Sequence, residues 1–114
     1  MKRFEIWSAD LPRIDGSHVQ QGFRPILIIS NDRANTYSPV ITAIPLTSRL
    51  TKHPMPTHVR LQGHSLPKAS LALCEQVLSL DKVRLKKRMG VVEAASDRAA
   101  ICHALAVQLD MAAA

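Results

Sequence analysis

The sequence predicts a mainly β domain, in which a small, strongly bent, barrel-like sheet is followed by one C-terminal helix. Two patterns predict this fold: short apolar runs separated by Pro- and Gly-bearing connections up to residue 92, and apolar residues at helical spacing from Ser96 onward. With 114 residues the chain has room for one core, so residues 1–114 are expected to form a single domain. Hydrophobic residues at 46% and charged residues at 21% are typical of a folded globular protein.

Apolar alternation and short apolar runs predict strands at residues 4–9, 24–30, 40–46, 57–61, 70–80 and 85–92, the last being one strand or a pair. Residues 26–29 are continuously apolar and include three isoleucines, which predicts a strand buried on both faces. Pro45 requires an edge position or a bulge near the end of its strand. Residues 70–80 fit helix or strand by periodicity, and Glu75 and Gln76 inside the run favour a strand that crosses the core and emerges at a site.

The connections contain turn formers and candidate caps. Residues 10–21 form a loop of about a dozen residues, a length that is often functional in a compact domain. A turn-rich stretch after the next strand includes a short helical turn around residues 33–35. Asp81 is expected to cap another helical turn, and Ser96 or Asp97 to cap the C-terminal helix. The residues of that helix expected to face the sheet are Ile101, Cys102, Leu105, Ala106 and Leu109.

The sequence carries no signal-peptide pattern and no apolar segment of membrane-spanning length, so we expect a soluble, cytoplasmic protein without a membrane partner. Cys74 and Cys102 lie in apolar surroundings without metal-ligand spacing, and two buried thiols in a reducing compartment are expected. The sequence contains no metal motif, phosphate-binding glycine loop or serine-nucleophile motif, so no metal or other cofactor is expected.

The charge is one-sided as well as positive. The net charge is +6, and no acidic residue occurs between Asp32 and Glu75. The cations in that window are Arg33, Arg49, Lys52, Arg60 and Lys68, and a second basic block follows at residues 82–88. Surfaces of this kind attract polyanions, which means either a nucleic acid or an acidic protein segment.

Polar side chains occur where the predicted strands begin or end: Arg24, Thr47, His58, Glu75 and Gln76. Arg24 is always charged and precedes Pro25, whose fixed dihedral stiffens the strand start. By itself Arg24 is either a solvated strand cap or a cation held still. An Arg with a hydroxyl neighbour suits chemistry on a phosphodiester, because both groups stabilise charge that builds on phosphate oxygens when an RNA 2′-hydroxyl attacks.

Several short motifs follow one another along nearly the whole chain. They are Gly22-x-Arg24-Pro25 with an apolar strand and Ser30-Asn31, then Ser38-Pro39, Pro45-Leu46-Thr47-Ser48, Pro56-Thr57-His58-Val59, Leu73-Cys74-Glu75-Gln76, and Leu80-Asp81-Lys82-x-Arg84-Leu85. Their order and spacing resemble the MazF/PemK family of type II toxin–antitoxin ribonucleases. Gly-x-Arg-Pro alone is a weak signal, whereas several blocks in register are specific.

The resemblance implies an SH3-like barrel of the CcdB/MazF type that forms a homodimer. It implies a sequence-selective, metal-independent endoribonuclease (an mRNA interferase) that cleaves single-stranded RNA and leaves 2′,3′-cyclic phosphate and 5′-hydroxyl ends. It also implies a cognate antitoxin whose acidic, disordered C-terminal segment occupies the substrate groove, and DNA binding by the toxin–antitoxin complex. Arg24 matches the family's catalytic Arg and Thr47 its catalytic Thr, while Glu75 and Gln76 match acid/base or base-reading positions.

The sequence also departs from the family pattern. Phe4 stands where many relatives have Gly, and the loop before Arg24 lacks the acidic residue that relatives carry there. Arg24 cannot act as a base, because its pKa lies far above neutrality. Candidates for the proton acceptor are therefore His18, His58 and Glu75, and His18 is attractive because an unperturbed imidazole titrates near neutrality. The expected RNA-binding residues are Gln20, Gln21, Phe23, Ser48, His58 and Gln76.

Some roles and functions stay open from the sequence. His58 either acts in the site or only lines the sheet, and His53 and His64 are expected to be solvated. Two other functions fit the same fold: a CcdB-like poison of DNA gyrase, and an RNA-binding domain without catalysis. RNA cleavage that depends on Arg24 would separate the ribonuclease from both.

Overall fold

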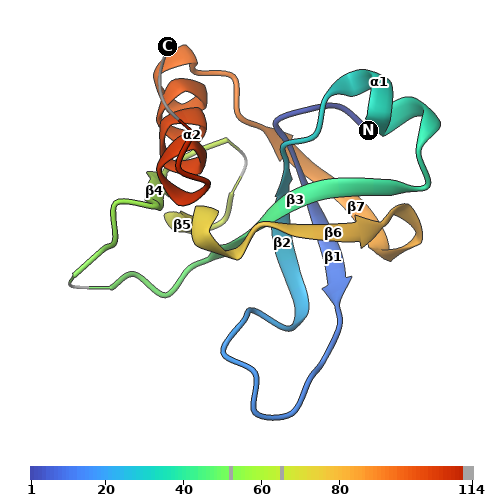
Figure 1. Ribbon diagram of the computed structural model, residues 1–114, viewed down its shortest axis with the longest axis horizontal. Coiled ribbons are helices and arrows are strands. Elements are labelled where there is room, and N and C mark those ends of the chain that lie inside the picture. The colour runs from blue at the N-terminus through green and yellow to red at the C-terminus, as the bar shows by residue number, and fades with distance from the viewer. Residues whose placement is uncertain (52, 65, 112–114) are drawn as a thin grey trace.

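A computed structural model describes residues 1–51, 53–64 and 66–111. Within these residues the strands are β1 (Glu5–Leu11), β2 (Gly22–Ile28), β3 (Val40–Thr47), β4 (His58–Leu61), β5 (Ser70–Leu73), β6 (Leu78–Asp81) and β7 (Leu85–Val91). The helices are α1 (Asp32–Tyr37) and α2 (Ala95–Gln108), with short 3₁₀ turns η1 (Cys74–Gln76) and η2 (Lys82–Arg84). Figure 1 shows α2 packed on one side of the sheet and the β1–β2 loop projecting from its opposite end.

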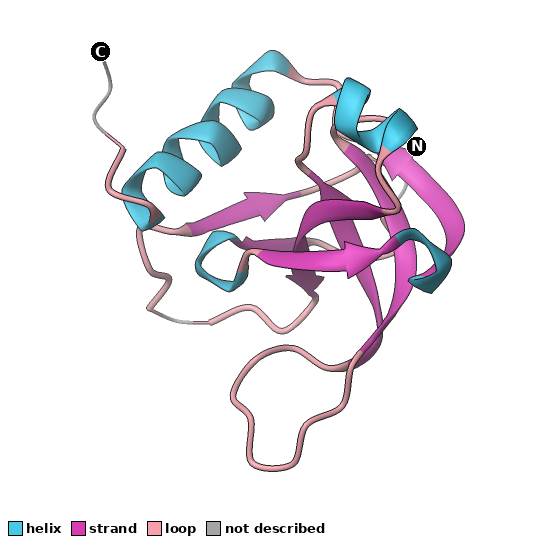
Figure 2. Cartoon of the chain, turned by 45° about the vertical axis from the view of Figure 1, so that its right-hand side comes forward, coloured by secondary structure: helices cyan, strands magenta, loops and turns pink. Residues whose placement is uncertain are grey.

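The described strands form one antiparallel sheet in the order β4-β5-β3-β2-β1-β7, with β6 also paired to β3. β3 is the central strand: one edge pairs with β2, and the other pairs first with β6 at residues 40–43 and then with β5 at residues 46–47. Pro45 lies between those two stretches, where a missing N–H costs no ladder hydrogen bond. It is therefore at a change of partner rather than on an edge strand. The sheet bends strongly around this strand (Figure 2).

The bent sheet separates two apolar clusters. The larger one lies between the sheet and α2 and includes Leu27, Ile44 and Ile101. The smaller one fills the inside of the curl and includes Ile26, Ile28 and Leu80. Because successive strand residues face opposite sides, β2 contributes to both clusters, which confirms a strand buried on both faces. The expected mainly β, barrel-like fold with a C-terminal helix is also confirmed.

Three local predictions are wrong. The run 70–80 is two strands, because η1 interrupts it at Cys74–Gln76 and turns the chain from β5 to β6. The helix α2 begins earlier than predicted, after Ala94 and without a side-chain cap. The turn η2 follows Asp81, but that carboxylate makes no capping hydrogen bond. The predicted turn near residues 33–35 is the helix α1, which Asn31 caps by accepting from the Ala34 N–H at 2.9 Å.

The thiols differ from expectation. Cys74 is buried, and its burial, together with the neighbouring Glu75 and Cys102, raises the pKa of the thiol to about 12. Cys102 is exposed on α2, with an Arg3 guanidinium nitrogen 3.5 Å from its sulfur, so the prediction of two buried thiols is wrong. Cys102 lies at the edge of the apolar face that the 3.6-residue period predicts. A side chain at that edge points to solvent after a small rotation of the helix about its axis.

Phe4 occupies a strained position at the start of β1. Its backbone φ is 70°, in the left-handed region that disfavours residues with a Cβ. The ring is nonetheless buried in the larger cluster, and the guanidinium groups of Arg3 and Arg98 lie 4.6 and 4.8 Å from its centroid. The buried ring and its two cation–π contacts offset the cost of this backbone conformation.

Glu5 ties the first strand to the last one. Its carboxylate accepts hydrogen bonds from the Lys2 backbone at 2.9 Å, from Trp7 Nε1 at 3.0 Å and from Arg88 Nε at 3.0 Å. Partial burial by itself raises the pKa of this carboxyl, but these hydrogen bonds together lower it below its ordinary value. No helix among the described residues has the length and apolar character needed to cross a membrane.

Candidate active site

Arg24 and Thr47 come from adjacent strands of the sheet. The antiparallel register pairs Ile26 with Pro45, and continuing it by two residues sets Arg24 across from Thr47. Directly opposed residues of an antiparallel pair lie on the same face of the sheet, with Cβ atoms about 5 Å apart. The recorded pairs end at Ile26 and Pro45, and the same register extended past them sets the two residues named from the sequence opposite one another.

Backbone contacts hold both side chains. The half-buried Arg24 donates from Nε to the carbonyl of Gln21 at 2.7 Å, which leaves its terminal nitrogens to bind an anion. Thr47 Oγ1 accepts from the Arg49 N–H at 3.2 Å, and its own proton remains available for donation. Arg24 and Ser48 line a surface hollow of about 320 Å³ together with Phe23 and Lys68.

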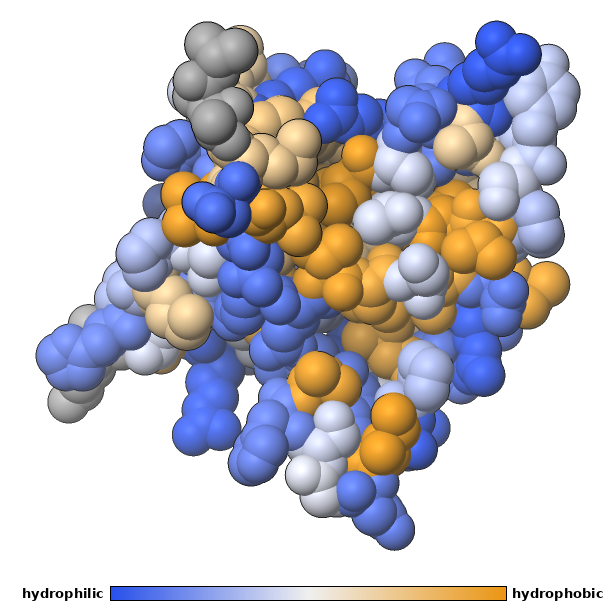
Figure 3. Space-filling view, in the orientation of Figure 1, coloured by the Kyte–Doolittle hydropathy of each residue, from blue (hydrophilic) through white to orange (hydrophobic). Residues whose placement is uncertain are grey.

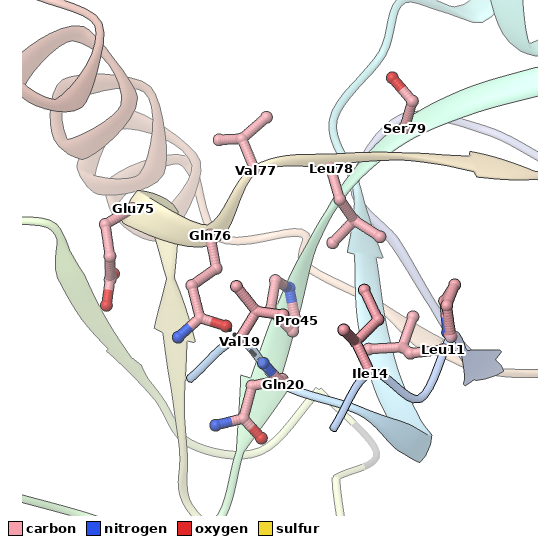
Figure 4. Close-up of a pocket in the computed structure, with 11 residues that line it drawn as sticks. Leu11, Ile14, Val19, Gln20, Pro45, Glu75, Gln76, Val77, Leu78 and Ser79 are labelled. Atoms are coloured by element: carbon pink, nitrogen blue, oxygen red, sulfur yellow. Dashed lines mark hydrogen bonds between the residues drawn. The ribbon is translucent and has the colours of Figure 1, made fainter. Parts of the chain in front are cut away.

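A second hollow, also about 320 Å³, lies between the β1–β2 loop and η1 (Figure 4). Its wall is mostly apolar, and Figure 4 shows the Gln76 side chain reaching toward Val19 and Gln20 of the loop. Gln76 Oε1 accepts the backbone N–H of Gln20 at 2.7 Å, so one of the predicted RNA-binding residues anchors another. The remaining residues around this hollow include Leu11, Ile14, Pro45, Glu75 and Leu78.

Gln20 presents a buried acceptor that lacks a partner. Among the described residues its side-chain Oε1 is the one buried side-chain oxygen or nitrogen without a hydrogen bond. Burying such a group unpaired costs about 1–3 kcal/mol, so it favours a ligand that brings a donor. Gln76 lines the same hollow from η1 and adds a second side-chain amide to its mostly apolar wall. This combination is suited to a flat, polar-edged ring.

His58 and Glu75 form a half-buried pair. His58 Nε2 lies 3.0 Å from Glu75 Oε2, and Thr57 Oγ1 donates to Glu75 Oε1 at 3.3 Å. The other ring nitrogen, Nδ1, accepts the Met55 N–H at 3.1 Å. This hydrogen-bond pattern assigns the proton of a neutral ring to Nε2, which then donates to Glu75. Both side chains are thereby engaged with one another, and His58 is more than a residue lining the sheet.

The loop residues predicted from sequence take different places. Gln21 binds the loop's own backbone, because its Oε1 accepts from Ile14 N and its Nε2 donates to Ile14 O, both at 2.9 Å. His18 is exposed in the same loop and lines neither of the two hollows. Glu75 and Gln76 lie on η1 rather than on a strand, which corrects their predicted setting.

Two further histidines were expected in solvent. His53 is exposed, whereas His64 Nε2 lies 2.8 Å from Asp97 Oδ2 and links the β4–β5 connection to α2, so the second expectation is wrong. Sequence reasoning also missed Thr57 and Lys68, whose positions beside Glu75 and Arg24 depend on long-range pairing. Lys52, one of the cations of the acid-free window, lies outside the described residues. The described residues contain no cluster of His, Cys, Asp and Glu able to hold a metal ion.

Comparisons with known proteins show the family to which the chain belongs. A family model described as PemK-like, MazF-like toxin of type II toxin–antitoxin system matches residues 2–109. An endoribonuclease MazF of Staphylococcus saprophyticus is 42% identical over 91 residues, which are 78% of this chain and 75% of that protein.

Solved structures give the same result for the fold. An endoribonuclease from a mycobacterial species, in complex with its cognate antitoxin, has a TM-score of 0.80 and 26% identity and covers 100% of this chain and 99% of its own. MazF from Deinococcus radiodurans has a TM-score of 0.79 and 26% identity and covers 96% of each chain. The chain therefore belongs to the PemK-like and MazF-like toxin family of type II toxin–antitoxin systems.

Proposed function

We propose that this chain is a sequence-selective, metal-independent endoribonuclease that cleaves single-stranded RNA, acting as the toxin of a type II toxin–antitoxin system. The observation that supports the proposal is the β2–β3 register, which when continued by two residues sets Arg24 across from Thr47, while Arg24 also lines a surface hollow with Lys68. The 42% identity to an endoribonuclease MazF supports it.

In the proposed reaction the RNA 2′-oxygen attacks the adjacent phosphorus, and the bond from phosphorus to the 5′-oxygen breaks. The products are a 2′,3′-cyclic phosphate and a 5′-hydroxyl, with one proton removed from the 2′-hydroxyl and one delivered to the leaving oxygen. Arg24 stabilises the charge on the non-bridging oxygens, because its Nε binds the Gln21 carbonyl and its two terminal nitrogens can donate to the phosphate. Thr47 donates its hydroxyl proton to the same phosphate.

The residue that accepts the proton of the 2′-hydroxyl is chosen between Glu75 and His18. Glu75 already accepts hydrogen bonds from His58 and Thr57, so we assign the His58–Glu75 pair to positioning η1 and, through it, Gln76. His18 stays the candidate base, because its ring makes no hydrogen bond within the described part of the chain and it sits on the loop next to Gln20. Loss of the acid limb of the pH–rate profile in a folded His18→Ala protein would support this role, because a base stops accepting protons once it is protonated.

Sequence selectivity is assigned to the hollow between the loop and η1. An RNA base inserted there would lie against the apolar wall, and its amino or imino proton would meet the buried Oε1 of Gln20. Gln76 Nε2 would donate to an acceptor on the same base edge. Gln21 keeps the loop closed rather than reading a base directly.

The proposal includes two protein partners. A cognate antitoxin with an acidic C-terminal segment fits the acid-free basic window, and a mycobacterial relative was solved with its own antitoxin. A homodimer is proposed because apolar surface covers the side of the molecule formed by β3 and β6 (Figure 3), where Val40 and Leu78 stay partly exposed. We place the protein in the cytoplasm, with its toxin–antitoxin complex binding DNA.

The test is cleavage of a long, unstructured RNA by the purified protein in excess EDTA, with mapping of the cut sites and end groups. We expect a few preferred sequences, cyclic-phosphate and 5′-hydroxyl ends, and loss of cleavage in a folded Arg24→Ala protein. RNA left intact while DNA gyrase is inhibited would support the CcdB-like function instead. RNA bound but never cut would support a domain without catalysis.

A further inference from the structure

Two surface hollows share two of their lining residues, Phe23 on β2 and Met89 on β7. One is the hollow that contains Arg24, and the other, of about 400 Å³, lies over β1 and β7. We call the two hollows together the Phe23 groove. The residues that define it are Arg24, Ser48, Lys68, Phe23, Met89 and Lys87.

Phe23 is exposed for a reason that lies in the fold. Residues four apart on a strand share a face, so Phe23 and Leu27 both lie on the side of the sheet that α2 covers. Leu27 is fully buried in the cluster beneath α2, whereas Phe23 lies beyond that cover and is 63% exposed. Its cross-strand partner is Asp10, which offers no apolar contact to hide the ring. The Phe23 ring is therefore exposed to solvent in both hollows of the groove.

The groove is also cationic. Within the described residues, the ammonium groups of Lys68 and Lys87 make no ion pair. Asp10, the cross-strand partner of Phe23, is paired with Arg13 at 3.6 Å and Arg84 at 3.8 Å, and Glu5 is paired with Arg88 at 3.0 Å. An exposed ring between unpaired lysines is the arrangement with which proteins bind single-stranded nucleic acid, because bases stack on the ring while cations meet the phosphates.

We propose that the Phe23 groove holds the stretch of single-stranded RNA next to the cleaved phosphate, with one base stacked on Phe23 and phosphates beside Lys87 and Lys68. The inference rests on the proposed ribonuclease function, because the RNA is placed here on the ground that Arg24, which is assigned to the cleaved phosphate, lines one of the two hollows. Every base has a stackable face, so this contact adds affinity for longer RNA without adding bases to the recognised sequence.

The test measures binding rather than cleavage. Fluorescein-labelled 2′-O-methyl oligoribonucleotides of mixed sequence, about 12 and about 4 nucleotides long, cannot be cut by 2′-hydroxyl attack and are titrated by fluorescence anisotropy. Phe23→Leu is expected to weaken binding of the longer probe by about fivefold to a hundredfold, and Phe23→Trp to restore it. The short probe should be affected far less, because it can occupy the Arg24 end alone.

Lys87→Ala is compared with Lys86→Ala, which removes the same charge from the neighbouring position. Lys86 is exposed, and its ammonium group donates to the Val83 carbonyl at 3.3 Å, outside the groove. Lys87→Ala should reduce the slope of log affinity against log salt concentration by about 0.7, the contribution of one phosphate contact on a single strand. Lys86→Ala should leave the slope unchanged.

Equal effects of Lys86→Ala and Lys87→Ala, or a Phe23→Leu protein with unchanged affinity for the longer probe, would overturn the proposal. So would Phe23 and Lys87 variants that keep RNA affinity but lose binding of an oligo-glutamate peptide, since the groove would then belong to an acidic protein segment. Failure of this proposal can be distinguished from failure of the proposed ribonuclease function. A protein that does not cleave RNA, but whose probe binding still depends on Phe23 and Lys87, would refute the ribonuclease function and leave the groove proposal intact.

Discussion

Arg24 and the β1–β2 loop that precedes it are adjacent in sequence, yet they are held in very different ways. Arg24 belongs to β2, whose backbone pairs with β1 along its whole length. The loop, residues 12–21, is held mainly by side-chain hydrogen bonds, from Gln21 to Ile14 and from Gln76 to Gln20. Each of those bonds contributes about 1 kcal/mol, whereas the sheet opens only cooperatively.

This difference separates the two tasks of the proposed enzyme. To stabilise charge on the phosphate, a cation must be held within a fraction of an ångström of the productive position. A strand in the middle of a sheet is rigid enough to hold it there. Base selection needs a surface that differs between relatives, which a loop with replaceable contacts provides. Gly22, with φ of 80°, is the joint between the two, since the left-handed backbone there turns the loop into the strand. Changes to the loop should therefore alter what is cut, and changes to β2 should alter whether anything is cut.

Replacing Arg24 has the largest expected effect on activity. Arg24→Ala should lower kcat for RNA cleavage by about 10²- to 10³-fold, the usual loss when one charge-stabilising donor is removed. Stability should change little, because the half-buried side chain makes one hydrogen bond to the backbone. Single-turnover cleavage and thermal unfolding are measured side by side, with the exposed Arg60→Ala on β4 as the matched control. Cleavage within tenfold of the wild type would show that the strand does not carry the chemistry.

The second test concerns the pair behind η1. Glu75→Gln keeps the shape but removes the carboxylate that accepts from His58 and Thr57, so it should lower the free energy of unfolding by about 1–3 kcal/mol. Under stabilising conditions kcat should fall by less than about tenfold, as expected of a positioning residue. Urea unfolding and the pH–rate profile are the measurements, and the exposed Glu93→Gln is the control. A loss of kcat as large as that of Arg24→Ala, with a vanished acid limb, would make Glu75 the base instead.

The same division explains what the sequence could predict. The apolar run of β2, the Arg24–Pro25 start and the period of α2 are local signals, and they place both elements within a few residues. The face of α2 is less well predicted, because Cys102 and Leu109 are exposed while Ala104 is buried. The His58–Glu75 and Gln76–Gln20 contacts join segments 17 and 56 residues apart, and no local pattern encodes such pairing. The apolar run 70–80 continues through Glu75 and by itself predicts one strand, whereas the change of partner along β3 requires a turn there.

Gln76→Ala tests the anchoring of the loop. Loss of the 2.7 Å bond to the Gln20 backbone should cost about 1 kcal/mol of substrate binding, which is about a fivefold rise in KM with kcat nearly unchanged. The pattern of cut sites on a long RNA should broaden, because the hollow loses both its anchor and one amide. Gln62→Ala, an exposed glutamine of the β4–β5 connection, serves as the control. An unchanged cut pattern together with a large fall in kcat would reverse the roles given to loop and strand.

The smallest effect concerns the strand framework and appears only as a pH dependence. The pKa of Glu5 is lowered in the folded chain, so its contribution to stability is fully present above its ordinary pKa of 4.5 and is lost as pH falls through the folded value. The difference in the free energy of unfolding between the wild type and Glu5→Gln should therefore be constant from neutral to mildly acidic pH and shrink below about pH 4.5. Urea unfolding at several pH values measures it, and the difference should be smaller throughout in an Arg88→Ala background, which lacks the guanidinium 3.0 Å away. A difference that grows toward acid pH would mean that burial, rather than the hydrogen bonds from Trp7, Lys2 and Arg88, dominates at this carboxylate. The link between β1 and β7 would then add nothing to the rigidity on which the position of Arg24 depends.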